Sequence, residues 1–288
     1  MEQFLVSHEA AITWGIFVSA IVLVGLAETF RPRRDLTKPT GRRWIANGLL
    51  AGTQFGVYAL LPVGATLISI LVRNSPYGLL NRAAIPYAIR FAAGMMVLDL
   101  AHYATHYFLH RFSWLWRIHQ VHHSDPDFDF TTGVRTHPVE MIVTETVHLA
   151  SIALLAPPPV AVIVLAMFTA MQNLFTHANW RVPAWIDSAM RRILVTPDVH
   201  RIHHSDSITE QNTNFGFVFT WWDRLFGTYL GSPALGHEKM GVGLQGFKDH
   251  RSMNILHLLA MPFWKSTEPQ NQVVEPQNTG VRATTASR

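Results

Sequence analysis

Four long apolar stretches constrain the fold of this chain more than any other feature of its sequence. They cover residues 11–27, 45–72, 84–101 and 141–177. An α-helix needs about 20 apolar residues to cross the hydrocarbon core of a bilayer, because each residue advances it by only ~1.5 Å. Charged residues make up 15% of the chain, against about 25% in soluble domains. We therefore expect an all-α, polytopic membrane helix bundle.

The fourth stretch is too long for one span and is interrupted by Pro157, Pro158 and Pro159. Proline lacks the backbone N–H that a helix interior needs and clashes with the preceding turn. We expect a hairpin of two short helices, 141–156 and 160–177, with the prolines at its tip. The predicted number of membrane helices is then about five.

Basic residues predict the orientation of this bundle. The loop after the first stretch carries six of them between residues 31 and 43, whereas the loop before the third stretch carries only Arg73 and Arg82. Lys and Arg are enriched in cytoplasmic loops. The N-terminus is therefore expected outside, and residues 102–140 and 178–288 are expected in the cytoplasm.

The composition divides the chain into three parts. Residues 1–83 hold the first membrane helices and the basic loop, residues 84–264 hold the later apolar stretches and the clustered histidines, and residues 265–288 are expected to be a disordered tail rich in Gln, Asn, Thr and Pro. Residues 253–264 are a short apolar segment, for which we expect a helix on the membrane surface. The net charge is +4, but the basic residues form no long stripe, so we expect no nucleic-acid partner.

Histidines are nearly as frequent as acidic residues, at 16 against 19, and several of them are clustered. Three clusters hold eight of them: His102 and His106 in HYATH, His119, His122 and His123 in HQVHH, and His200, His203 and His204 in HRIHH. On a helix, residues three and four apart share one face. Imidazole is a common ligand of transition metals, and eight imidazoles exceed what one tetrahedral zinc ion needs. The pattern predicts a site for two metals.

Ligation by nitrogen alone fits zinc, iron, copper or nickel. The chain has no cysteine, which structural zinc sites prefer, and no H-E-x-x-H motif of a metalloprotease. The glutamates of ferritin-like di-iron bundles are also absent at these spacings. We expect a histidine-rich di-metal site in a helical cap on the cytoplasmic side of the bundle, where it could oxidise an unactivated C–H bond of a substrate held in the bilayer.

The chain resembles the fatty acid hydroxylase/sterol desaturase superfamily of integral membrane di-iron enzymes over about residues 84–230. Five blocks carry the resemblance in order: RIHQVHHSD at 117–125, RTHPVE at 135–140, NLFTHANW at 173–180, PDVHRIHHS at 197–205 and NFGFVFTWWDRLFGTY at 214–229. The resemblance implies two iron ions (Fe²⁺/Fe³⁺) that use O₂ to hydroxylate or desaturate a lipid. It also implies an external electron donor, cytochrome b5-like or ferredoxin-like.

The resemblance assigns the eight clustered histidines as metal ligands and adds His177, in the block NLFTH. Some members have a further histidine where this chain has Asn173, which either faces the metals or only packs between helices. A metal-bound imidazole usually donates its other N–H to a carboxylate or carbonyl. The further candidates for a supporting role are Asp99, His137, Glu140 and Asp198.

The alternative function is a histidine-rich membrane metal transporter or metal-binding protein. Transporters place their ligands near the middle of the bilayer on broken helices, often within inverted repeats. Here the clusters follow the ends of apolar stretches, and no such repeat is visible. The sequence leaves the lipid open, and it does not separate hydroxylation from desaturation.

Overall fold

The computed structural model describes residues 2–61, 64–81 and 85–264. Within these ranges the chain is helical and contains no β-strand, which confirms the predicted class. The α-helices are α1 (Glu2–Phe30), α2 (Thr40–Leu60), α3 (Ala65–Val72), α4 (Tyr87–Arg111), α5 (Ser113–His123), α6 (Pro138–Leu155), α7 (Pro159–Thr176), α8 (Ala184–Met190), α9 (Pro197–His203), α10 (Ile208–Gln211), α11 (Trp221–Phe226) and α12 (Ile255–Ala260). Short 3-10 helices are η1 (Leu79–Asn81), η2 (Phe130–Val134), η3 (His250–Met253) and η4 (Met261–Phe263).

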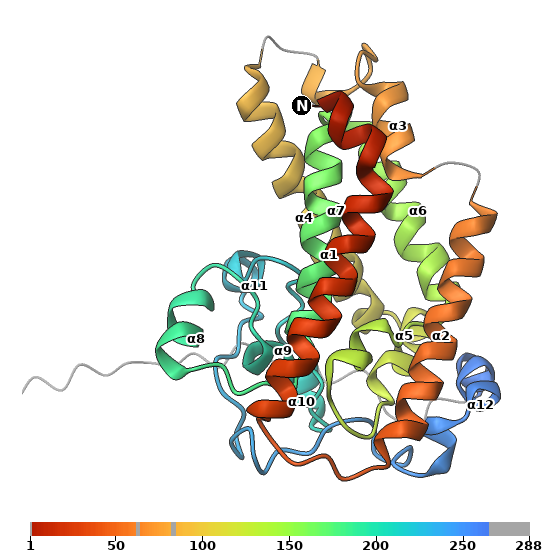
Figure 1. The fold of residues 1–288 in the computed structure, drawn as a ribbon, viewed down its shortest axis with the longest axis vertical. Helices are drawn as coiled ribbons and strands as arrows, with labels where there is room; N and C mark the ends of the chain where they lie inside the picture. The colour runs from red at the N-terminus through yellow and green to blue at the C-terminus, as the bar shows by residue number, and fades with distance from the viewer. Residues whose placement is uncertain (1, 62–63, 82–84, 265–288) are drawn as a thin grey trace, which may run out of the picture.

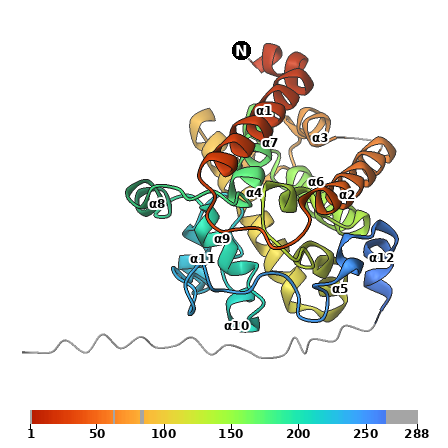
Figure 2. The ribbon, with the colours of Figure 1, turned by 60° about the horizontal axis from the view of Figure 1, so that its bottom comes forward.

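The long helices form a bundle, and the short ones form a cap at one end of it. In Figure 1, α1, α2, α4, α6 and α7 run roughly along the long axis, with α5 and α8 to α12 gathered near their lower ends. Figure 2 brings this lower end forward. Helix α7 packs against α1 and α4, and α4 also contacts α5 and α6. The side of the membrane on which the cap lies stays a prediction.

Within the described part of the chain, four stretches are long and apolar enough to cross a membrane: Glu2–Phe30, Thr40–Val72, Pro138–Leu155 and Pro159–Thr176. The second contains α2 and α3, so the predicted span 45–72 is not one continuous helix. Helix α2 ends at Leu60 because Leu61, which precedes Pro62, has an extended backbone (φ −73°, ψ 124°).

Of the predicted third span, 84–101, residue 84 lies outside the described residues and helix α4 covers 87–101, but α4 is not among these four stretches. Arg90, Asp99 and His102 lower its mean hydropathy. The expected total of five membrane helices therefore stays a prediction.

The predicted hairpin is present, with helix ends shifted by up to three residues. Ala156 ends α6 in the left-handed conformation (φ 51°) and donates its N–H to the carbonyl of Ile152 at 2.8 Å. The tip packs closely on α4 at Gly94. A Cβ added to Gly94 would lie only 2.8 Å from Cβ of Pro157, so a larger residue would not fit there without a shift. The hairpin and α4 thus share one apolar core, which includes Leu98, Ile152 and Leu165.

A buried ion pair attaches α2 to the segment that follows α5. Arg43 of α2 donates to Asp125 at 2.7 Å and to Asp129 at 2.8 Å, and all three side chains are almost fully buried. A buried charge is tolerated when it is paired and hydrogen-bonded, as here. Burial alone would raise the pKa of Asp125, but the charges of Arg43 and Arg135 outweigh it and lower the pKa to about 2.

The apolar segment 253–264 forms α12 and η4, which are only partly exposed. Leu258 and Met261 are buried against Trp116 of α5, whereas Leu256 and Phe263 point outward. A helix is therefore present where we predicted one, and its contact with the membrane stays a prediction. The predicted tail, 265–288, lies outside the described residues.

Candidate metal centre

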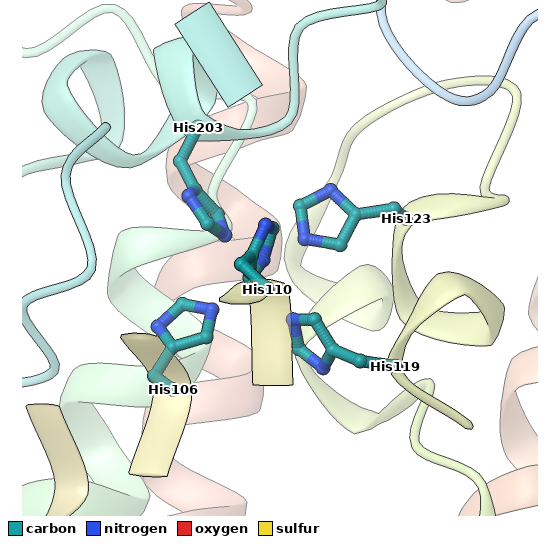
Figure 3. A group of neighbouring side chains, drawn as sticks. All are labelled: His106, His110, His119, His123 and His203. Carbon is teal, nitrogen blue, oxygen red and sulfur yellow. The ribbon is translucent and has the colours of Figure 1, made fainter. Parts of the chain in front are cut away.

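Nine histidine side chains gather into two neighbouring groups where the bundle meets the cap. In each group, one ring nitrogen of every histidine lies within 4.8 Å of those of the others. The first group is His106, His110, His119, His123 and His203. The second group is His122, His177, His200 and His204. Figure 3 shows the first group, in which rings from α4, α5 and α9 lie close together.

Helix geometry explains why neighbouring histidines belong to different groups. Successive residues of an α-helix are rotated by about 100°, so His122 and His123 of α5 point in different directions. His123 joins His119, one turn earlier on α5, in the first group. His203, at the end of α9, belongs to the first group, while His200 and His204 face the second. Helices α5 and α9 therefore each serve both groups, which places the two groups side by side.

Five of these imidazoles are held by a hydrogen bond at Nδ1. The acceptors are the carbonyls of Phe215 for His106 (2.9 Å), Arg135 for His122 (3.2 Å), Asn173 for His177 (2.7 Å) and Thr213 for His203 (2.8 Å), and the carboxylate of Glu140 for His119 (2.7 Å). Carbonyls and carboxylates only accept, so Nδ1 carries the hydrogen in each ring. The other nitrogen, Nε2, is left with its lone pair, as in most metal-bound histidines.

The free nitrogens face one another. Nε2 of His177 lies 3.2 Å from Nε2 of His122 and 3.0 Å from Nε2 of His200. His122 and His177 both carry their hydrogen on Nδ1, so these two Nε2 atoms cannot hydrogen-bond each other. In the first group, Nε2 of His106, His119 and His203 is buried and has no hydrogen-bond partner among the described residues. Buried lone pairs converging without donors are what a bound cation would satisfy, so the residues fit a metal in each group.

Burial keeps five of these histidines in the neutral form that binds metals. It lowers the pKa of His122, His123, His200 and His204 well below the ordinary value, and neighbouring imidazoles lower it further. The pKa of His203 falls to about 3 for the same reasons. These five imidazoles are therefore neutral at pH 7, and a metal that binds them need not displace a proton from them.

The two groups contain eight of the nine histidines predicted as ligands. They differ from the predicted set at one position, where His110 takes the place of His102. His102 belongs to neither group and stacks instead on His148 of α6, with ring centroids 4.9 Å apart. His110, which the sequence analysis overlooked, occupies the first group. The segment HYATHYFLH repeats histidine every four residues, so the pair His106–His110 lies one turn, about 6 Å, further along α4 than His102–His106. That later pair is the one that meets α5.

The predicted supporting carboxylates have three different roles. Glu140 contacts a histidine of the first group, His119, as expected for such a residue. Asp99 instead accepts hydrogen bonds from the backbone N–H of Val218 (3.2 Å) and from the indole of Trp222 (2.8 Å). It thereby fixes the loop whose Phe215 carbonyl holds His106. Asp198 pairs with Arg33 (3.1 Å) and with Arg201, not with a histidine of either group.

His137 and Asn173 hold backbone segments together. Nδ1 of His137 accepts the N–H of Val139 at 3.1 Å, so this residue caps α6 and belongs to neither group. Nδ2 of Asn173 donates to the carbonyl of Gly133 at 2.7 Å, which is the contact expected of a packing residue. The Asn173 carbonyl also accepts from His177. A Cβ on Gly133 would lie 2.9 Å from that carbonyl oxygen, so glycine permits this close approach.

Arg135 is a supporting residue that the sequence analysis did not single out. Its carbonyl accepts from His122, and its guanidinium donates to Val121, Ser124 and the Asn47 side chain at 2.7–2.8 Å. Burial lowers the pKa of Arg135 to about 10, which leaves it charged at pH 7. It fixes the end of α5 from which three of the nine histidines project. No motif in the sequence marks an arginine for this role.

Residues 91–228, which include all nine histidines, match the family model described as fatty acid hydroxylase. This chain contains a fatty acid hydroxylase domain. The match confirms the resemblance seen in the sequence. Together with the apolar helices it identifies an integral membrane protein.

Three curated relatives of this chain are named as hydroxylases or monooxygenases of lipids. An ornithine lipid hydroxylase from Rhizobium tropici is 25% identical over 235 residues, which are 79% of this chain and 70% of that protein. Human alkylglycerol monooxygenase is 30% identical over 150 residues, covering 51% of this chain and 31% of that protein. Rat methylsterol monooxygenase 1 is 26% identical over 153 residues, covering 51% and 49%. The chain thus spans half or less of these two monooxygenases. No solved structure matches it.

Proposed function

We propose that this chain is a membrane-bound di-iron oxygenase that hydroxylates a C–H bond of a lipid. The observation that carries the proposal is the pair of buried histidine groups, whose unpartnered ring nitrogens converge at two adjacent points. The names of the three relatives support the reaction, because each joins hydroxylation or monooxygenation to a lipid. They favour hydroxylation over desaturation, and they disfavour the metal transporter.

The proposed ligands of one iron are the five histidines of the first group, and those of the other iron are the four of the second group. His102 is not among them. Iron is consistent with ligation by imidazole alone, and the choice of iron over zinc or copper rests on the family resemblance. When bound, the two iron ions would supply the O₂-dependent oxidation of the lipid.

The protein's own contribution is to hold the imidazoles in place before a metal binds. In five of the nine rings, the hydrogen bond at Nδ1 fixes the ring plane and aims Nε2 inward. The carboxylate of Glu140 adds negative charge next to His119, which makes that imidazole a better electron donor. Because these partners lie on α6 and α7, directly after η2 and in the 213–215 loop, the centre forms only when bundle and cap are folded together.

Aromatic side chains keep water from the centre. Phe128 lies against His177 and His204, with ring centroids 5.6 and 5.1 Å apart, and is 1% exposed. Phe215 packs on His106 and His203 from the other side, at 5.7 and 5.5 Å. Excluding water protects a strong oxidant from side reactions with solvent. A lipid in the bilayer would approach the centre from the bundle, and an external electron donor would bind at the cap on the cytoplasmic side.

The proposal is tested with protein purified in detergent, loaded with Fe²⁺ and supplied with a chemical or enzymatic reductant. Oxygen consumption is measured with an ornithine lipid, an alkylglycerol and a methylsterol, and products are identified by mass spectrometry. We expect consumption to depend on one of these lipids and its product to carry one added oxygen atom. A His250→Ala variant, altered at an exposed histidine outside both groups, is the control and should retain full activity. Iron-loaded protein that consumes no oxygen with any lipid would contradict the proposal.

A further inference from the structure

His102 and His148 form a pair of histidines that lies outside the two metal groups. The two rings stack with their planes 12° apart. Nδ1 of each ring is buried and has no hydrogen-bond partner among the described residues. Buried polar atoms in proteins nearly always have a partner, so both nitrogens retain an unused capacity for hydrogen bonding. Neither belongs to the centre described above.

The pair does not have the form of a third metal site. Ligating rings point their lone pairs at one common position, whereas these rings lie face to face. No third histidine or carboxylate joins them in a group within the described part of the chain. Glu145, one turn before His148 on α6, accepts the hydroxyl hydrogen of Tyr58 at 2.9 Å. The unused nitrogens are therefore suited to hydrogen bonds.

The pair lies between a candidate membrane span and the first metal group. His148 lies in the middle of α6, a candidate membrane span, and both histidines are only half-buried at the residue level. Ionisable residues within a span are expensive and usually functional. His102 lies one turn, about 6 Å, before His106 on α4. Phe217 packs on His102 at 5.4 Å and comes from the same loop as Phe215, whose carbonyl holds His106.

We propose that His102 and His148 bind an uncharged hydrogen-bonding group of the lipid substrate, such as a hydroxyl, ester or amide. This inference rests on the proposed function. A neutral imidazole offers one donor and one acceptor, which suits such a group. Because the pair lies one helical turn from His106, the oxidised carbon is only a few bonds away from the bound polar group. The enzyme then oxidises the lipid near its polar end and leaves the distal end of the chain unmodified.

The test uses the full-length protein with His102→Phe and His148→Phe, which keep a flat ring and remove its nitrogens. His148→Gln retains a donor and an acceptor, and His250→Phe makes the same change at an exposed histidine. Binding of hexadecylglycerol to the resting protein is measured against hexadecane, which lacks the hydroxyls. Iron content, KM and the position of the added oxygen are measured alongside.

Each Phe variant should retain its iron and bind hexadecylglycerol about tenfold more weakly, as expected for one lost hydrogen bond. Binding of hexadecane should not change, and His148→Gln should recover most of the affinity. KM should rise in parallel, and the added oxygen should spread to other carbons. His250→Phe should behave as the wild type.

Loss of iron in His102→Phe would overturn the inference, because it would make His102 a ligand. Unchanged affinity for hexadecylglycerol in both Phe variants, or no preference of the wild type for it over hexadecane, would also overturn it. Failure of the proposed function is a separate result: binding would still depend on the pair, but the wild type would oxidise no lipid.

Discussion

Nδ1 of His119 lies 2.7 Å from Oε1 of Glu140, and both side chains are buried. This contact fixes which ring nitrogen of His119 carries the hydrogen. It leaves Nε2 facing the other four histidines of the first group. Glu140 also lies in the first turn of α6, so the contact joins the membrane hairpin to the helix that carries HQVHH.

We expect Glu140→Gln to weaken iron binding about 10- to 100-fold, in the range seen when such outer partners of metal ligands are changed. Glutamine keeps the shape and an acceptor oxygen but removes the charge that makes His119 a better ligand. Iron affinity is measured by titration into metal-free protein, and thermal unfolding of that protein should change little. An unaltered iron affinity would show that the charge of Glu140 is unimportant to the centre.

His110 and His102 give opposite predictions when each is changed to alanine. His110→Ala removes a member of the first group and should lower the iron content and abolish lipid oxidation. His102→Ala should keep the iron, because this ring lies outside both groups. Metal analysis of the two purified variants distinguishes them. Loss of iron in His102→Ala but not in His110→Ala would instead show that His102 is the ligand, as predicted from the sequence.

Asn173→His should lower the stability of the protein and leave its metal content nearly unchanged. The amide of Asn173 donates to the Gly133 carbonyl at 2.7 Å, and a larger ring in this close contact forces neighbouring groups apart. We expect a destabilisation of about 1–3 kcal/mol, measured by thermal or denaturant unfolding in detergent. A stable variant that keeps both metals and has altered turnover would instead place Asn173 at the metals.

The ion pair between Arg43 and Asp125 predicts a pH dependence of stability. The pKa of Asp125 is lowered to about 2, below its unfolded value, so the folded state gains stability above pH ~4. That gain is lost as the pH falls from about 4 to about 2. Asp125→Asn should remove this dependence and destabilise the protein by about 1.5–3 kcal/mol at pH 7, because Arg43 loses one of its two carboxylate partners and keeps only Asp129. Parallel pH profiles for the variant and wild type would contradict this role.

The orientation in the membrane is tested with topology reporters fused at Ser75 and at the C-terminus. The excess of basic residues between positions 31 and 43 predicts that this loop is cytoplasmic. Ser75 should then lie outside and the C-terminus inside. Both reporters appearing on the same side of the membrane would disprove the arrangement.

Local patterns in the sequence were sufficient for the hairpin and for most of the histidines, but not for the break between α2 and α3. Three prolines in a row mark the hairpin, and a spacing of four residues places His119 and His123 on one face of α5. The choice between His102 and His110 could not be made in this way, because both lie four residues from His106. It depends on where α5 packs along α4, which is a tertiary contact.

Sequence patterns also could not predict which residues hold the segments around the histidines in place. Arg43 and Asp125 are 82 residues apart, and neither belongs to a motif that predicts their pairing. Asp99 was expected to support a histidine directly, because it lies one turn from His102. It instead holds the loop around Val218, and its effect reaches His106 through the Phe215 carbonyl.

The most direct test of the di-iron centre is the iron content of the purified protein and of two single variants. His122 belongs to the second group and His203 to the first, so each variant removes a proposed ligand of a different iron. We predict two iron ions per chain in the wild type, and fewer in both His122→Ala and His203→Ala, with the protein still inserted in the membrane. An iron content that is the same in the wild type and in both variants would contradict the proposed centre.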